Sequence, residues 1–238
     1  MSRIGVLGGM GPVATVDFLD KLVKLTPASR DQEHIPVIVA NLPHVHDCSD
    51  AILGSGKNPL SQLLDGIGLL NQVAVGVVVI PCNSAYHWYE AISQASKAPV
   101  LHIAKVSVET IMSDGVSKVA IFAAQGALAC GIYQRELQGK DIPFLLPEIA
   151  AGQVAINNCI REIKAGNFER GGHYLSDACK EAADPGASTL ILGNNELPIA
   201  AKYADVQGLT LVDSTLELAR ASVEFALIRG WNRLGWDT

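Results

Sequence analysis

The sequence has little charge, few aromatic side chains and no run of basic residues. Of its 238 residues, 18% are charged, 5% are aromatic and 49% are hydrophobic, and the formal net charge is −6. Disordered chains show the opposite balance of charge and hydrophobicity, so this composition excludes that class. A negative chain without a Lys/Arg cluster is also a poor match for nucleic acid or an anionic membrane. We therefore expect a folded chain that binds neither.

Long apolar runs are missing as well. The longest near-continuous stretch covers residues 73–80 and is too short to span a bilayer. A second apolar stretch follows Arg3, but four glycines and a proline interrupt it between residues 5 and 12. This segment therefore reads as a strand that enters a loop, not as a secretory signal.

The cysteines do not form a recognisable framework. They are Cys48, Cys82, Cys130, Cys159 and Cys179. Their number is odd and no pair has CxxC spacing, which argues against a set of disulfides or a zinc ribbon. We expect free thiols, no bound metal and a cytoplasmic location.

The pattern that is present is an alternation of short β-branched runs with helical periodicity. The predicted strands cover residues 4–7, 37–40, 75–80, 99–103, 119–123, 190–192 and 209–212. Apolar runs of this length are typical of parallel sheets covered on both faces. One predicted helix has an apolar face made of Val16, Leu19, Leu22 and Val23, and another begins at Asn58-Pro59. The sequence thus predicts the α/β class.

A faint internal repeat divides the chain. Residues 3–6 resemble 118–121, residues 79–83 resemble 191–195, and residues 101–102 resemble 212–213, in the same order and at nearly constant separation. Two copies are too few for a solenoid. They predict two pseudosymmetric lobes, each a mainly parallel sheet flanked by helices, with the active-site cleft between them. The predicted lobes are 1–103 plus 210–238, and 104–209.

Two glycine-rich segments do not match nucleotide-binding motifs. The loop at residues 8–12 lacks the GxGxxG spacing, and residues 54–57 match only half of a P-loop. The first loop still lets backbone N–H groups approach an anion such as a carboxylate, although a tight structural turn would explain its glycines too.

Cys82 stands out because it ends the most hydrophobic predicted strand and precedes Asn83 and Ser84, which favour helix starts. The positive end of a helix stabilises a thiolate, which could act as a nucleophile or a base. A buried structural cysteine is the alternative interpretation. The six histidines are scattered, so no Cys–His–Asn triad can be assigned.

Five segments together resemble the aspartate/glutamate racemase family. They are IGVLGGMGP at 4–12, DQEH at 31–34, PCNSA at 81–85, LGNNELP at 192–198 and VDST at 212–215. The resemblance covers nearly the whole chain. It implies two pseudosymmetric lobes, a homodimer, no cofactor and a small amino-acid or carboxylate substrate. It also implies two cysteines across a cleft, one removing the α-proton and the other returning a proton to the opposite face.

The sequence departs from this pattern within the expected site. Cys82 matches the first catalytic cysteine, but Asn194 occupies the second position, and an amide neither accepts nor donates a proton usefully near neutral pH. Cys48 stands where the family has an arginine that holds an acidic side chain, and Cys130 lies where hydroxyls are usual. Lys164 matches a lysine that contacts substrate.

These matches give a set of predicted site residues. Cys82 and Asn194 are the catalytic candidates, with Asn194 as a hydrogen-bond partner and not a base. The predicted substrate-binding residues are Met10, Gly11, Cys48, Asn83, Ser84, Gln125, Cys130, Lys164, Asn195 and Glu196.

Three functions remain open at this point. The first is a racemase-like isomerase, independent of pyridoxal phosphate, which uses Cys82 at an α-carbon and acts on a substrate other than aspartate. Cys48, Cys130 or a water would then serve as the second proton carrier. The second is a one-cysteine lyase or isomerase acting on a small carboxylic acid. The third is a relative that binds a small ligand without turnover.

Overall fold

The computed structural model describes residues 2–113, 118–147, 152–183, 187–206 and 208–232. The elements of the first part of the chain are β1 (Ile4–Gly8), α1 (Pro12–Leu25), the 3₁₀ helix η1 (Asp31–Glu33), β2 (Val37–Asn41), α2 (Cys48–Ile52), α3 (Leu60–Gln72), β3 (Val77–Val79), the 3₁₀ helix η2 (Ser84–Trp88), α4 (Tyr89–Ala95) and α5 (Ile103–Ser113). The later elements are β4 (Val119–Ala123), α6 (Gln125–Cys130), α7 (Ile132–Gln138), β5 (Phe144–Leu145), α8 (Gly152–Lys164), α9 (Phe168–Ala183), β6 (Thr189–Gly193), α10 (Leu197–Ala201), β7 (Thr210–Asp213) and α11 (Ser214–Ile228).

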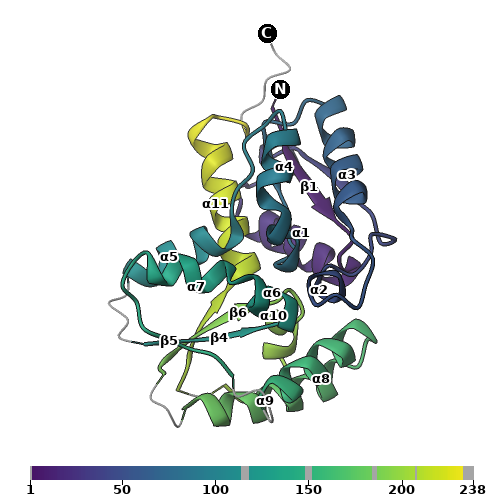
Figure 1. Ribbon diagram of the computed structural model, residues 1–238. Helices are drawn as coiled ribbons and strands as arrows, with labels where there is room; N and C mark the ends of the chain where they lie inside the picture. Colours follow the sequence, from purple (N-terminus) through teal and green to yellow (C-terminus); the bar gives the residue numbers. More distant parts are fainter. Residues whose placement is uncertain (1, 114–117, 148–151, 184–186, 207, 233–238) are drawn as a thin grey trace.

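The strands form two separate parallel sheets. The first has the order β2-β1-β3 and the second the order β5-β4-β6-β7. Every strand pair in both sheets is parallel. Helices flank both sheets (Figure 1). The prediction of an α/β fold with two mainly parallel sheets is therefore confirmed.

The two faces of the second sheet pack against different hydrophobic clusters, and one of these clusters extends into the first lobe. In β4, Val119, Ile121 and Ala123 belong to a core cluster that continues into the first lobe, while Ala120 and Phe122 point into a second cluster. Successive side chains of a strand point to opposite faces, so one sheet serves both clusters. Helices α8 and α9 cover the second cluster, and α5, α7 and α11 cover the other face (Figure 1). The lobes therefore share one continuous core.

Strand β7 belongs to the second sheet, although the predicted boundary at residue 210 places it in the first lobe. Strand β7 pairs with β6, with Leu190 opposite Leu211, so residues 210–213 hydrogen-bond within the second sheet. The helix that follows, α11, packs against α1 and α5. The return to the first lobe thus coincides with the start of α11 at Ser214.

Three local expectations differ from the structure. Residues 99–103 form only an isolated bridge between Val78 and Val100, because Ile103 already begins α5. The predicted apolar face of α1 is wrong in part, since Val16 and Val23 are 66% and 57% exposed. Its buried face carries Phe18 and Leu22 among other residues. The two-residue strand β5 was not predicted.

The start of α3 agrees with its sequence signal. The side-chain oxygen of Asn58 accepts a hydrogen bond of 2.9 Å from the backbone N–H of Leu60, and Pro59 lies between them. Among the described residues, no helix is long and apolar enough to cross a membrane.

Candidate active site

The strands of both sheets point their carboxyl ends at one cavity of about 480 Å³. In parallel α/β sheets this is where ligands bind. Strands β1 and β3 lead into the lining segments 9–13 and 82–84, and β4 and β6 lead into 124–125 and 194–196. Both lobes therefore contribute walls to the same cavity.

The structure brings the predicted site residues together, with one exception. Lining the cavity are Met10, Gly11, Cys48, Cys82, Asn83, Ser84, Gln125, Lys164, Asn194, Asn195 and Glu196. The exception is Cys130, which ends α6 and does not line the cavity. Its Sγ lies 3.2 Å from the backbone oxygen of Ala127, and burial raises the pKa of its thiol. The position of Cys130 does not support a role as the second proton carrier.

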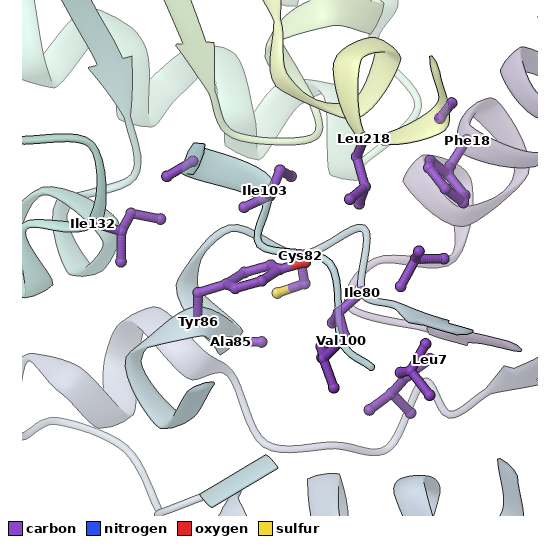
Figure 2. Packing of buried hydrophobic residues seen from close by; sticks show 14 of the residues in the cluster. Leu7, Phe18, Ile80, Cys82, Ala85, Tyr86, Val100, Ile103, Ile132 and Leu218 are labelled. Atoms are coloured by element: carbon purple, nitrogen blue, oxygen red, sulfur yellow. The ribbon is translucent and has the colours of Figure 1, made fainter. Parts of the chain in front are cut away.

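Cys82 and Cys48 lie against each other on the first-lobe wall. Cys82 lies three residues after the end of β3, and Figure 2 shows it beside the ring of Tyr86 and close to Ile80. Cys48 begins α2. Cys82 is 6% exposed and Cys48 is 5% exposed. A hydrogen bond to Cys82, with burial, raises the pKa of the Cys48 thiol well above its usual range. Cys48 therefore stays protonated and donates to the Cys82 sulfur.

Two asparagines join the walls at the base of the cavity. Asn83 Nδ2 donates to Asn195 Oδ1 at 2.9 Å, and Asn195 Nδ2 donates to the backbone oxygen of Met10 at 3.2 Å. The hydroxyl of Tyr133 donates to Asn83 Oδ1. The sequence predicts these amides as ligands of a substrate carboxylate, but in the structure they hold the two lobes in register. Their roles toward a substrate remain predictions.

The second-lobe wall carries a buried carboxyl group. Glu196 is 3% exposed, and its backbone N–H donates to Asn194 Oδ1 at 2.9 Å. The Asn194 side chain also hydrogen-bonds the Glu196 carboxyl. Burial raises the pKa of this carboxyl above its usual range, against the opposing field of Lys164 and that hydrogen bond. Asn194, at the position where the resemblance predicts a thiol, therefore supports an acidic group two residues further along the chain.

An ion pair spans the cavity between the lobes. Lys164 Nζ, at the end of α8, lies 3.3 Å from Oδ2 of Asp47, the residue that caps α2. Burial lowers the pKa of Lys164, but Glu196 and Asp47 outweigh it and raise that pKa. The carboxyl of Asp47 shows the opposite shift, because Lys164 overcomes the effect of burial and lowers its pKa.

The charges along the cavity differ from those expected for an acidic substrate. Asp47, Asp50 and Glu196 line it together with a single lysine, Lys164. Among the described lining residues there is no arginine. The described part of the chain also holds no group of three or more His, Cys, Asp or Glu side chains placed to bind a metal ion.

Sequence reasoning missed the part of the wall that α8 supplies. Asn157 and Ile160 line the cavity on the same helix as Lys164. They precede it by seven and four residues, so all three lie on one face of a helix with 3.6 residues per turn. That spacing was a usable signal. Asp47 was missed too, although it is a side-chain N-cap of α2.

The carboxyl ends of two parallel sheets meet at a shared cavity, which has a thiol on one wall and a buried carboxyl on the other. This arrangement defines a two-lobe α/β protein with an enzyme-like cleft. The family model described as Asp/Glu/Hydantoin racemase matches residues 7–222. The chain belongs to this racemase family.

Relatives agree with this assignment. The chain is 26% identical over 224 residues to the broad specificity amino-acid racemase RacX of Bacillus subtilis (strain 168), covering 92% of this chain and 96% of that protein. The aspartate racemase of Picrophilus torridus has the same fold, with a TM-score of 0.85, 24% identity, and 95% and 94% of the two chains covered. The glutamate racemase of Francisella tularensis gives a TM-score of 0.70 at 17% identity, covering 98% of this chain and 84% of that one.

Proposed function

We propose that this chain is an amino-acid racemase that works without pyridoxal phosphate and uses Cys82 to move the proton at the α-carbon. The observation that carries the proposal is the position of Cys82, at the carboxyl end of β3, within the shared cavity and hydrogen-bonded by Cys48. Family membership supports the reaction class.

The chemistry needs a strong base in contact with a weakly acidic C–H bond. The Cys82 thiolate would take the α-proton, and the electron pair would spread into the α-carboxylate of the substrate. Hydrogen-bond donors near that carboxylate stabilise the developing charge. Cys48, whose thiol pKa is raised, can donate a hydrogen bond to the Cys82 sulfur, and a hydrogen bond to a charged acceptor is stronger than one to a neutral acceptor.

We propose a substrate other than aspartate. An acidic side chain would need a free cation, but Lys164 is paired with Asp47, and no arginine is found among the described lining residues. A further acidic side chain, Asp50, lines the cavity and would repel an acidic side chain of the substrate. The relative named a broad specificity amino-acid racemase is in keeping with this choice. A homodimer, as the resemblance implies, and a cytoplasmic location, as the cysteine pattern indicates, are part of the proposal.

The second candidate is a one-cysteine lyase or isomerase acting on a small carboxylic acid. Asn194 favours it, because an amide stands at the pseudosymmetric counterpart of Cys82. In that reaction Cys82 would protonate a carbanion formed by loss of a carboxyl group or another substituent, and no opposite acid would be needed.

Proton NMR in D₂O separates these functions. Pooled L-amino acids and small dicarboxylic acids are incubated with the protein, and the products are then separated by chiral chromatography. Loss of one α-proton signal, with appearance of the D-enantiomer, supports the racemase. A new product without an enantiomer pair supports the lyase. If every signal stays intact over the whole pool, racemisation is contradicted.

A further inference from the structure

Inversion of an α-carbon requires a proton carrier on the wall opposite Cys82. The described second-lobe residues that line the cavity are 124–125, 194–196 and positions 157, 160, 163 and 164 of α8. Among them only two side chains titrate, those of Lys164 and Glu196. Cys48 is on the same wall as Cys82 and is hydrogen-bonded to it, so it cannot reach the opposite face of the substrate.

Of these two side chains, Lys164 is the poorer carrier. Its ammonium is paired with Asp47 at 3.3 Å, and its side chain is 48% exposed at the edge of the cavity. A carrier that serves both directions of a racemisation must hold a proton in one and accept it in the other. The pKa of Lys164 is raised by Glu196 and Asp47, although burial lowers it, and this keeps the ammonium charged. Lys164 can stabilise negative charge but is a weak base.

Glu196 has the placement that the reaction needs. Its Oε1 lies 3.5 Å from the point where a Cβ would stand on Gly11, which also lines the cavity. The carboxyl therefore points toward the glycine loop at the carboxyl end of β1. Burial raises the pKa of this carboxyl, so the protonated form persists closer to neutral pH than that of an exposed glutamate.

We propose that Glu196 is the second proton carrier of this site and that Asn194 is the positioning residue that holds it. The inference rests on the proposed function. The Cys82 thiolate takes the α-proton of one enantiomer, so that the C–H bond breaks and an S–H bond forms. The Glu196 O–H bond then breaks, and its proton joins the electron pair on the opposite face of the α-carbon. The products are the other enantiomer, a Cys82 thiol and a Glu196 carboxylate, and the reverse direction restores the starting protonation.

The two contacts between Asn194 and Glu196 fit this division of roles. Asn194 Oδ1 accepts from the Glu196 backbone N–H at 2.9 Å, and the Asn194 side chain bonds the carboxyl itself. A thiol at position 194 would offer neither a comparable acceptor nor an amide donor. This explains why an asparagine and not a thiol stands at position 194, and what orients the Glu196 carboxyl.

The test follows α-proton exchange in D₂O separately for each pure enantiomer of the substrate found with the unaltered protein. In Glu196→Gln, conversion between enantiomers should fall at least about 100-fold. Exchange without inversion should persist for the enantiomer whose α-proton faces Cys82 and vanish for the other. Cys82→Ser should give the mirror pattern. The matched control is Glu217→Gln, a buried glutamate on α11 outside the cavity, which should convert both enantiomers normally.

Two further variants extend the test, and one of them covers the case in which Glu196→Gln does not fold. Adding Asn194→Cys to Glu196→Gln restores an acid on that wall and should recover part of the conversion. If Glu196→Gln does not fold, Glu196→Asp keeps a carboxyl at shorter reach, and the same one-sided exchange is expected in it.

The outcomes that overturn the inference are distinct from those that overturn the proposed function. Undiminished conversion in Glu196→Gln would overturn it, as would loss of exchange for both enantiomers in a variant whose unfolding midpoint is no lower than that of the unaltered protein. Either result leaves Cys82 racemisation in place. If the unaltered protein exchanges no α-proton of any amino acid, the proposed function falls and the inference falls with it.

Discussion

Asn83 and Asn195 occupy corresponding positions in the two lobes and are hydrogen-bonded to each other, from Nδ2 of Asn83 to Oδ1 of Asn195 at 2.9 Å. Each follows the strand that leads into its wall of the cavity. Tyr133 and Ser214 also hydrogen-bond Asn83, and Asn195 continues to the backbone of Met10. The walls that carry Cys82 and Glu196 are thus tied together one residue away from each.

We expect this pair to contribute stability as a unit. Asn83→Ala removes the acceptor of the buried Tyr133 hydroxyl and the donor to Asn195 Oδ1, which should lower the free energy of unfolding by about 1–3 kcal/mol. Asn195→Ala should cost a similar amount. In a double-mutant cycle measured by urea unfolding, the double variant should lose less than the two single losses added together. Strict additivity would show that the two asparagines act independently.

A buried lysine should hold α1 to the start of α11. Lys21 Nζ lies 2.6 Å from Asp17, from Asp213 and from the hydroxyl of Thr215. Lys21→Met leaves Asp213 without its cationic partner, so we expect a loss of about 3 kcal/mol in urea unfolding. The control is Lys24→Met, since the pair of Lys24 with Asp20 is exposed, and its loss should stay within about 0.5 kcal/mol. Equal losses in the two variants would contradict the account.

Glu196 and Asp47 should change stability with pH in opposite senses. Because burial raises the folded-state pKa of Glu196, ionising it costs stability as pH rises above the reference value of 4.5. Glu196→Gln should therefore gain stability relative to the unaltered protein between pH 4.5 and 8. Burial raises the pKa of Asp47, but Lys164 lowers it further, so its contribution is present above 3.8 and lost as pH falls through the folded value.

The pH dependence assigned to Asp47 is tested with Asp47→Asn, because asparagine can still cap α2. It should be less stable than the unaltered protein at pH 7, and the difference should shrink as pH falls below 3.8. Thermal unfolding measured across pH gives both curves. Curves of the same sign for Glu196→Gln and Asp47→Asn would refute the assigned shifts.

Cys48 should affect the rate through its hydrogen bond to Cys82. Cys48→Ala removes the donor, and hydrogen bonds to charged groups contribute about 1.5–3 kcal/mol, so α-proton exchange should slow by about tenfold or more. Cys48→Ser keeps an O–H donor and should retain most of the rate. Exchange in Cys48→Ala at the unaltered rate would show that the thiol has no influence on Cys82.

The fold could be predicted where the signal was local and repeated. The apolar runs at β1, β2, β4 and β6 gave the parallel strands, and the Asn58-Pro59 pair marked the start of α3. Tertiary contacts decided the rest. Val16 and Val23 fit an apolar helix face, but α1 buries the face of Phe18 instead. The two residues of β5 are too few for any periodicity.

The residues of the site could be predicted from the sequence, but the contacts between their side chains could not. The strand-end motifs identified the segments around Cys82 and Asn194, and these do meet at one cavity. The contact of Cys48 with Cys82 joins residues distant in sequence and has no local signal. The hydrogen bond of Asn194 to the Glu196 carboxyl depends on a buried side-chain orientation that the sequence does not encode visibly. Similarly, the Asp47–Lys164 pair appears only once α2 faces α8.

The central claim is that Cys82 moves the α-proton, and the most direct measurement is α-proton exchange in D₂O by Cys82→Ala beside Cys179→Ala. Cys179 is also a buried free cysteine, but it lies in the second core cluster and does not line the cavity. We expect Cys82→Ala to lose conversion between enantiomers, together with exchange of the enantiomer that Glu196→Gln still exchanges, and Cys179→Ala to keep both. Conversion between enantiomers in folded Cys82→Ala, or exchange there of the enantiomer that Glu196→Gln still exchanges, would contradict the account.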